Sequence, residues 1–201
     1  MKKIRNKFSR YAMYSAIENF LKSKKLLSGK CLLIGDSLKG KGNQSKKIRN
    51  PTITNMLPSS CEIIAPSYPD VDIHDMPYKD NSFDYVIADQ VLEHVKKPWI
   101  GVEEVRRVLK SGGLTILTSA LIFCVHGVPS DYWRFTPEGL KILCENFSKI
   151  HRCSGTGDLN FVMDIFHKKG GRQVVPNTAL ETRALACDDK HLVSVWIIAE
   201  K

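Results

Sequence analysis

The chain has no paired-cysteine motif. No C-x-x-C pair occurs among its six cysteines, and no histidine lies at metal-ligand spacing from them. Scattered cysteines of this kind form neither a zinc site nor a disulfide framework, so we interpret them as reduced thiols, several of them in the core. The sequence therefore predicts no metal site and a cytoplasmic location. The six are Cys31, Cys61, Cys124, Cys144, Cys153 and Cys187.

The chain also lacks a recognisable targeting or membrane-spanning segment. Its N-terminus is basic, but the following YAMYSAIENFL contains Glu18 and Asn19 and has no small-residue cleavage site. The longest uncharged run, residues 111–130, is interrupted by glycine and proline, so it indicates a turn, a buried strand and a loop. Repeats and low-complexity tracts are absent as well. With 201 residues the chain can bury a full core without disulfide or metal crosslinks.

Acidic residues are scarce at the beginning of the chain. Residues 1–50 contain 14 lysines and arginines but only Glu18 and Asp36 as acids, whereas the whole chain carries a net charge of +9. We interpret residues 1–28 as a solvated basic helical segment that precedes a domain formed by residues 29–201. The alternative is an anionic partner: a nucleotide-sugar, a lipid head group or a nucleic acid. Nucleic acid is unlikely, because the basic clusters contain no interleaved aromatic residues that would stack on bases.

A strand, a helix and a second strand follow one another between residues 83 and 119. Residues 83–88 (FDYVIA) and 114–119 (LTILTS) are short apolar runs typical of buried strands. Between them Pro98 suits a first helical turn, and Val102, Val105 and Val108 repeat at helical spacing. We expect this helix to run to Lys110, a cation in its last turn, and to stop at residues 111–113 (SGG). The pattern predicts a βαβ unit in a parallel sheet, with ligands at the carboxyl ends of its strands.

Other segments complete an α/β pattern. A helix is expected near residues 9–24, and another begins with Thr136 as cap and Pro137 in its first turn and runs to about residue 146. Four further strands are expected at residues 30–35, 61–65, 148–153 and 191–200. The sequence therefore predicts a three-layer α/β domain with a mostly parallel sheet.

Five motifs occur in a recognisable order: DIHDMPY at 72–78, NSFDYVIA at 81–88, VLEHV at 91–95, RVLKSGG at 107–113 and HGVPSDYWRFTPEGL at 126–140. This series resembles the class I S-adenosylmethionine-dependent methyltransferases. The last motif resembles a narrower branch, whose members often act beside enzymes of cell-surface polysaccharide synthesis. The resemblance implies a Rossmann-like methyltransferase fold with a C-terminal antiparallel strand. It implies S-adenosylmethionine as cofactor and O-methylation of a small-molecule or saccharide-like acceptor.

The resemblance also implies a set of cofactor contacts at the strand ends. Gly35 matches the first glycine of the family's glycine-rich turn, and Asp72 matches the acid that binds the adenine amino group. The alternative is that Asp72 and Asp75 are turn residues before Pro77. Two family acids are missing, because Leu33 and Ala65 stand in their places. An accessory or binding protein with a degenerate cofactor site is therefore the alternative function. The full predicted set is Gly35, Asp36 and Ser37 for the turn, Asp72, Ile73 and Met76 for adenine, and Ala88, Asp89 and Gln90 for the methionine end.

The acceptor side is expected in the loop that follows residues 114–119. His126 is a suitable general base, because the pKa of a histidine lies near working pH. Arg134 would hold a phosphate or carboxylate, with Asp131 and Tyr132 as further substrate contacts. The alternative is that Asp131 and Arg134 form a loop-locking ion pair, while Trp133 and Phe135 plug the core.

Two further motifs carry no predicted catalytic role. Glu93 and His94 of VLEHV are interpreted as anchors of a helical turn at the sheet edge. The enzymes that methylate amino groups of nucleic acids usually carry a polar-Pro-Pro-aromatic signature where this chain has Ala88-Asp89-Gln90-Val91, so base methylation has no support.

Overall fold

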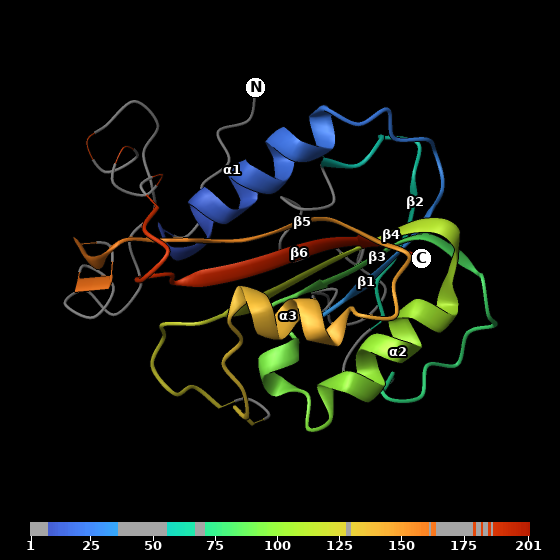
Figure 1. Ribbon diagram of the computed structural model, residues 1–201. Helices are drawn as coiled ribbons and strands as arrows, with labels where there is room; N and C mark the ends of the chain where they lie inside the picture. Colours follow the sequence, from blue (N-terminus) through green and yellow to red (C-terminus); the bar gives the residue numbers. More distant parts are fainter. Residues whose placement is uncertain are drawn as a thin grey trace, which may run out of the picture.

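A computed structural model describes residues 8–35, 56–66, 71–127, 130–160, 162–163, 179, 182, 185 and 187–201. Its centre is a six-stranded sheet of order β2-β1-β3-β4-β6-β5 (Figure 1). The strands are β1 (Lys30–Ile34), β2 (Glu62–Ile64), β3 (Phe83–Asp89), β4 (Leu109–Ala120), β5 (Lys149–Thr156) and β6 (Ser194–Glu200). The helices are α1 (Phe8–Lys22), α2 (Pro98–Val108) and α3 (Pro137–Leu143), and η2 (Leu92–His94) is a short 3-10 turn.

The first four strands are parallel, and β6 runs antiparallel to both β4 and β5. The predicted βαβ unit is confirmed, because β3 and β4 pair in parallel over Tyr85↔Leu114 to Asp89↔Thr118. The chain passes from β1 outward to β2 and returns to β3 on the other side of β1. The strand order therefore reverses between β1 and β3, and the carboxyl ends of these two strands are where ligands bind in open α/β sheets.

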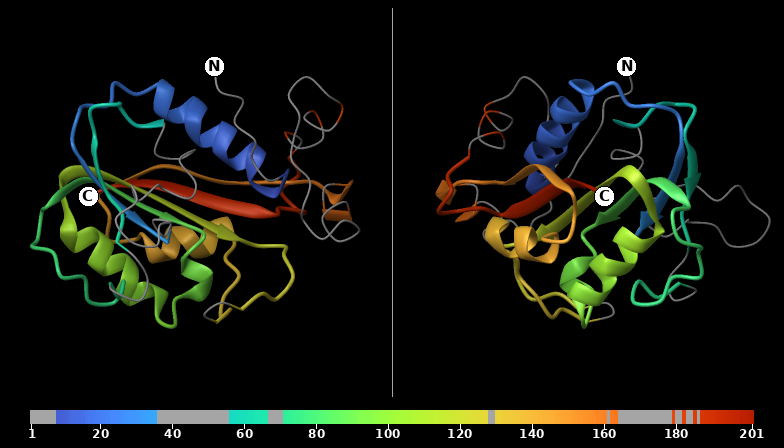
Figure 2. Two further views of the ribbon diagram at one scale, coloured as in Figure 1. Left: turned by 180° about the vertical axis from the view of Figure 1, so that it is seen from behind. Right: turned by 45° about the vertical axis from the view of Figure 1, so that its right-hand side comes forward.

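Helices cover both faces of the sheet. Figures 1 and 2 show α1 on one face and α2 with α3 on the other. Successive strand residues point to opposite faces, so Leu33 packs with Met13 and Ile17 of α1, whereas Leu32 belongs to the core under α2. On that second face Val102, Val105 and Val108 of α2 and Leu140 of α3 are all fully buried. The predicted three-layer α/β architecture is confirmed.

The end of α2 differs from the prediction. The helix ends at Val108, and Lys110 lies in β4, where its ammonium nitrogen is 2.9 Å from Asp84 of β3. At the carboxyl end of α2, Nζ of Lys201 donates to the carbonyl oxygens of Arg107 at 3.1 Å and Leu109 at 2.7 Å. The SGG segment lies within β4, where the pairing register shifts and Gly112 has a φ of +74°.

The start of α3 follows the prediction. The Oγ1 atom of Thr136 accepts a hydrogen bond from the backbone N–H of Gly139 at 3.1 Å, which is an N-cap, and Pro137 occupies the first turn. The helix ends at Leu143, earlier than expected. In the parts of the chain that the structure describes, no helix has the length and apolar character needed to cross a membrane.

Candidate functional site

Gly35 forms the turn directly after β1, at the point where the strand order reverses. Its φ is +92°, a backbone conformation that residues with a Cβ rarely adopt. A Cβ here would also come within 2.1 Å of Cγ2 of Val91, which follows β3. Glycine at this position therefore allows the ends of β1 and β3 to approach each other. Asp36 and Ser37 lie outside the described residues, so their predicted roles stay predictions.

Gln90 directly follows the neighbouring strand β3 and has a strained backbone conformation. Its φ is +56°, which is uncommon for a residue that is not glycine. Its backbone N–H donates to the carbonyl oxygen of Thr118 at 3.1 Å and to Oγ1 of Thr118 at 3.0 Å. Strain of this kind concentrates at functional sites, where the surrounding structure holds it in place.

Asp89, at the end of β3, is buried and tied to α1. Its Oδ2 accepts from the hydroxyl of Tyr14 at 2.6 Å, and its Oδ1 accepts from Oγ1 of Thr118 at 2.6 Å. The guanidinium of Arg10 lies 3.6 Å from the same Oδ2. Burial, followed by the Asp89 charge, raises the pKa of Tyr14 well above its usual range, so the phenol is a permanent donor. This carboxylate fixes α1 to the sheet edge, and its predicted contact with the cofactor stays a prediction.

The predicted adenine segment, residues 72–78, forms a turn ahead of β3. Asp72 has an exposed side chain, whose Oδ1 accepts from Nδ1 of His74 at 2.6 Å and from the His74 backbone N–H at 2.9 Å. These hydrogen bonds, the backbone one first, lower the pKa of Asp72. The ring of His74 in turn accepts from the backbone N–H of Lys97 at 3.2 Å, just before α2. The carboxylate of Asp72 is therefore ionised, exposed and oriented.

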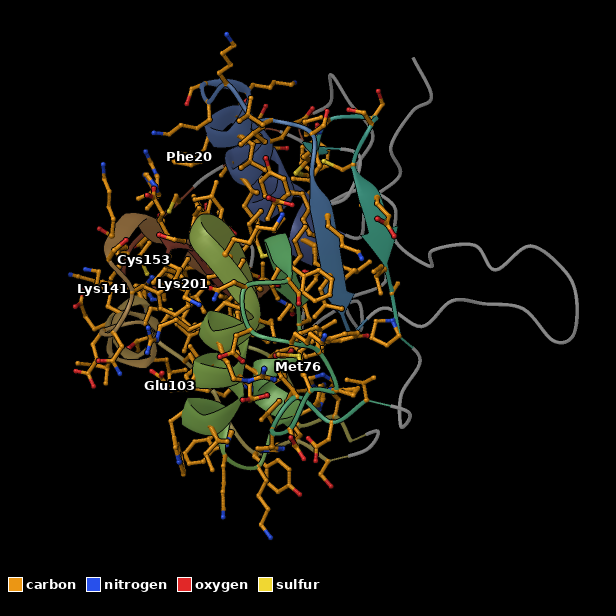
Figure 3. The ribbon with its side chains drawn as sticks, turned by 90° about the vertical axis from the view of Figure 1, so that its right-hand side faces the viewer. Phe20, Met76, Glu103, Lys141, Cys153 and Lys201 are labelled. Atoms are coloured by element: carbon orange, nitrogen blue, oxygen red, sulfur yellow. The ribbon has the colours of Figure 1, made fainter. Side chains whose placement is uncertain are left out.

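Ile73 and Met76 have buried side chains. They belong to the same hydrophobic core as Ile34 and Ala88, the last apolar residues of β1 and β3. Figure 3 shows Met76 beside α2. This core joins the adenine segment to the strand ends, and contact of Ile73 or Met76 with adenine stays a prediction.

Two residues of α2 hold this segment from the other side. The guanidinium of Arg107 donates to the carbonyl oxygens of Met76 at 2.9 Å and Tyr78 at 2.7 Å, and to Oδ1 of Asp80 at 2.8 Å. Glu104 accepts from the same guanidinium at 2.8 Å and from the backbone N–H of Met76 at 3.0 Å. We call Glu104 and Arg107 the α2 clamp. In the sequence both residues lie between the apolar positions of the helix, a pattern that gives no sign of this role.

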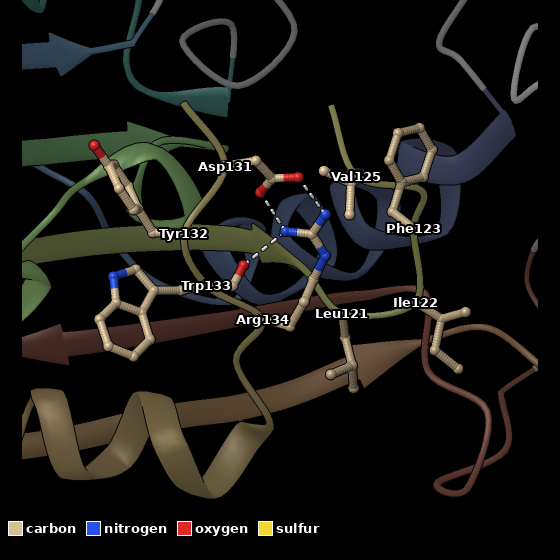
Figure 4. Close-up of a pocket in the computed structure, with 8 residues that line it drawn as sticks. All are labelled: Leu121, Ile122, Phe123, Val125, Asp131, Tyr132, Trp133 and Arg134. Atoms are coloured by element: carbon tan, nitrogen blue, oxygen red, sulfur yellow. Dashed lines mark hydrogen bonds and ion pairs between the residues drawn. The ribbon is translucent and has the colours of Figure 1, made fainter. Parts of the chain in front are cut away.

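A pocket of 420 Å³ lies beyond the end of β4 (Figure 4). Asp131 and Arg134 meet in it through a two-point ion pair, in which Nη2 of Arg134 lies 2.6 Å from Oδ2 of Asp131. Arg134 also donates to the carbonyl oxygens of Trp133 at 2.7 Å and Cys124 at 3.2 Å. The ion-pair alternative is thus realised, and the hydrogen bonds from Arg134 to Cys124 and from the His126 backbone to Asp131 join the two segments that line the pocket. The lining residues are Leu121, Ile122, Phe123, Val125, Asp131, Tyr132, Trp133 and Arg134.

The pocket has an aromatic rim. Tyr132 is 50% exposed and Trp133 is 37% exposed, so Trp133 does not plug the core, whereas Phe135 is buried as that alternative required. The indole N–H of Trp133 donates to the carbonyl oxygen of Val95 at 2.9 Å, and Trp99 of α2 makes an edge contact with the same ring. Exposed rings with a fixed orientation offer flat apolar surface to a ligand.

His126 lies between this pocket and the end of β3. Its backbone N–H donates to Oδ2 of Asp131 at 2.8 Å, and its ring makes an edge contact with the ring of His94 at a centroid distance of 4.9 Å. Ligand atoms of His126, His94 and Glu93 all lie within 4.8 Å of one another. Glu93 and His94 are adjacent in the VLEHV motif, which is the signal that the sequence offers for them. Their proximity to His126 depends on the fold.

Comparison with known proteins gives a family match in the central part of the chain. Residues 52–117, about a third of the chain, match the family described as a methyltransferase domain. An uncharacterized methyltransferase of Mycobacteroides abscessus is 46% identical over 43 residues, which are 21% of this chain and 17% of that protein. The matched segments span 13% to 22% of the length of such relatives.

Solved structures match over nearly the whole chain. A SAM-dependent methyltransferase from Aquifex aeolicus has a TM-score of 0.54 at 11% identity, covering 95% of this chain and 92% of that one. Phosphoethanolamine N-methyltransferase 2 of Haemonchus contortus, in complex with S-adenosyl-L-methionine, has a TM-score of 0.53 at 15% identity, covering 95% of this chain and 52% of that one. The chain therefore has the fold of the class I S-adenosylmethionine-dependent methyltransferases, and its central third matches a methyltransferase domain.

Proposed function

We propose that this protein is an S-adenosylmethionine-dependent methyltransferase. The observation that carries the proposal is the methyltransferase-domain match over residues 52–117, which includes β2 and β3 and reaches into β4. The strand-order reversal between β1 and β3, with Gly35 at the turn, supports the position of the cofactor there. S-adenosylmethionine is the cofactor, and it supplies a methyl group on a sulfonium.

The residues at the strand ends fit this cofactor in part. The open backbone at Gly35 suits a close approach of the methionine part, and the exposed carboxylate of Asp72 suits an amino-group donor. The two positions where the family has acids do not fit the cofactor, because Leu33 is fully buried and Ala65 has no polar side chain. Class I sites also use backbone contacts, so the cofactor would be held mainly by backbone groups and by Asp72.

We further propose that the acceptor oxygen belongs to a small molecule with a sugar-like face, bound in the pocket beyond β4. The exposed rings of Tyr132 and Trp133 would stack on such a face. Asp131 and Arg134 shape the pocket through their ion pair, and the Arg134 guanidinium is a cation in the pocket lining that would face an acidic acceptor. The protein's part in the chemistry is then alignment of the acceptor oxygen with the methyl group and help with its proton.

His126 is the residue that we propose for the acceptor proton. Its ring is partly exposed, with 40% of the side chain accessible, and it adjoins Phe123 and Asp131 of the pocket. Its Nδ1 lies 3.2 Å from the carbonyl oxygen of Cys124, which can only accept, so Nδ1 carries the proton and Nε2 keeps its lone pair.

The test is methyl transfer from S-adenosylmethionine with a labelled methyl group to a panel of hydroxyl-bearing saccharides, with S-adenosylhomocysteine release measured in parallel. His126→Ala should lower turnover about a hundredfold or more and leave cofactor affinity nearly unchanged. Label transferred to nitrogen would contradict the oxygen assignment. Cofactor binding without transfer to any acceptor would favour the accessory-protein alternative.

A further inference from the structure

Three possible metal ligands converge between the ends of β3 and β4. Glu93 and His94 come from η2, directly after β3, and His126 comes from the loop after β4. One ligand atom of each lies within 4.8 Å of the other two. A metal ion at the centre of such a group would need only small side-chain movements to reach bonding distances of about 2.0–2.2 Å.

Glu93 is the most informative member of this group. Glu93 is only 1% exposed, and its Oε2 accepts a hydrogen bond from Oγ of Ser119 at 2.9 Å. Its Oε1 is buried and has no hydrogen-bond partner among the residues that the structure describes. Leaving a buried carboxylate oxygen unpaired is costly, and buried charges in proteins are normally paired or coordinate metals. A metal ion bound at this oxygen would give it a partner.

The two histidines are held with one nitrogen free to bind that cation. Nδ1 of His94 lies 2.6 Å from the carbonyl oxygen of Ser130, and Nδ1 of His126 lies 3.2 Å from that of Cys124. Because carbonyl oxygens only accept, each Nδ1 carries a proton, and in the neutral ring Nε2 is the nitrogen left to bind a metal ion. Histidines that bind metals typically donate their other N–H to a carbonyl or carboxylate in this way.

From this geometry we propose that Glu93, His94 and His126 bind a divalent transition-metal ion such as Zn²⁺, Mn²⁺ or Co²⁺. Two imidazoles and one carboxylate are ligands that suit these ions. Three protein ligands leave coordination positions open, as in catalytic rather than structural sites. Asp131, which lines the pocket, lies 3.3 Å from Nδ1 of His126, so the site adjoins the proposed acceptor pocket.

The site also refines the part played by His126, and this step alone rests on the proposed function. A lone pair that binds a metal ion is not available to take a proton. In the metal-bound protein His126 would be a ligand, the ion would lower the pKa of an acceptor hydroxyl that coordinates to it, and the hydroxyl proton would pass to solvent water. Metal binding itself depends on neither cofactor nor acceptor, so it is testable without them.

The experiment uses the full chain without a histidine tag, stripped with a chelator and titrated with Co²⁺ by calorimetry and visible absorption. The wild-type chain should bind one Co²⁺ with the d–d absorption of a nitrogen and oxygen site, and Zn²⁺ should displace it. Glu93→Gln and His126→Gln should each weaken binding on the order of tenfold or more. Two matched controls should bind as the wild type does: His191→Gln, which alters a histidine paired with Asp188, and Cys124→Ser, which removes the exposed thiol next to the site.

Thermal melting shows whether each variant is folded, and His126→Gln changes a partly exposed side chain, so it tests the site even if Glu93→Gln misfolds. Absence of a Co²⁺ isotherm in the wild-type chain would overturn the proposal. The same holds if a folded His126→Gln chain binds Co²⁺ unchanged, or if Cys124→Ser abolishes binding and thus identifies a thiolate site. Because no cofactor is present, failure of methyl transfer would leave these results unaffected.

Discussion

At the scale of single residues, Gly35 carries the tightest steric requirement of the candidate cofactor site. Its positive φ and its distance to Val91 both exclude a side chain, so the close approach of β1 and β3 depends on one missing Cβ. The sequence predicted a glycine turn here from its likeness to a family motif. It could not predict the contact with Val91, since that contact joins positions far apart in the chain.

Gly35→Ala should therefore destabilise the protein by about 2–5 kcal/mol, combining a left-handed backbone cost of about 1–2 kcal/mol with an overpacking cost of about 1–3 kcal/mol. Urea unfolding measures the difference. Gly127→Ala is the matched control, because a Cβ at Gly127 would have no atom of the described residues within 4 Å, and its stability should change by less than about 0.5 kcal/mol. Equal stabilities of the two variants would show that the turn after β1 is not constrained.

Some candidate site residues make their contacts within one short motif, and others make them with distant parts of the chain. His126, Asp131 and Arg134 were recognised from one short motif, and the structure brings them together through contacts within that motif. Glu93 was assigned no chemical role, because burial and an unpaired oxygen are properties of the folded chain. Asp89 was expected to face the cofactor, and its three partners on α1 and β4 could not be read from spacing.

At the scale of elements, the α2 clamp is the main device that orients the adenine segment. Glu104 accepts from Arg107 and from the backbone of Met76, and these hydrogen bonds, led by those of Arg107, lower the pKa of Glu104. A carboxyl group whose pKa is lowered by folding stabilises the folded state above its unfolded pKa. That contribution is lost as the pH falls through the folded-state value.

Glu104→Gln should thus reduce stability at neutral pH by about 1–3 kcal/mol, the range for a hydrogen-bonded charged partner. The difference from the wild type should shrink as the pH falls below about 4.3, the unperturbed pKa of a glutamate, and urea unfolding at several pH values measures it. Glu138→Gln is the matched control, because Glu138 pairs with Lys141 three residues on, as Glu104 pairs with Arg107, but its side chain is 79% exposed. A pH-independent loss in Glu104→Gln would contradict the clamp.

Existence and type of the elements were predictable, and their ends were less so. The apolar runs of β3 and β4 and the valine spacing of α2 are strong local signals. The predicted end of α2 was wrong because a lysine and two glycines after a helix resemble a C-terminal cap. Here Lys110 is drawn to Asp84, and Lys201, at the other end of the chain, takes the place at the helix terminus.

At the scale of the whole molecule, two helical layers enclose a sheet, and the candidate site lies at the edge formed by the carboxyl ends of its parallel strands. Tyr14 of α1 binds Asp89 on one face, while the α2 clamp holds the adenine segment on the other, so both layers are tied to the region where we propose that the cofactor binds. The division into residues 1–28 and 29–201, and an anionic partner for the basic first quarter, stay predictions. Residues 1–7 and 36–50, which carry much of that charge, lie outside the described part of the chain.

The central claim is that this edge binds S-adenosylmethionine although two family acids are missing. Calorimetric titration of the full chain with S-adenosylhomocysteine tests it most directly. We expect one saturable site, weakened by about 1–3 kcal/mol in Asp72→Ala, the range for loss of a polar partner. A folded wild-type chain that takes up no S-adenosylhomocysteine at millimolar concentration would contradict the claim, and unchanged affinity in Asp72→Ala would contradict the adenine assignment.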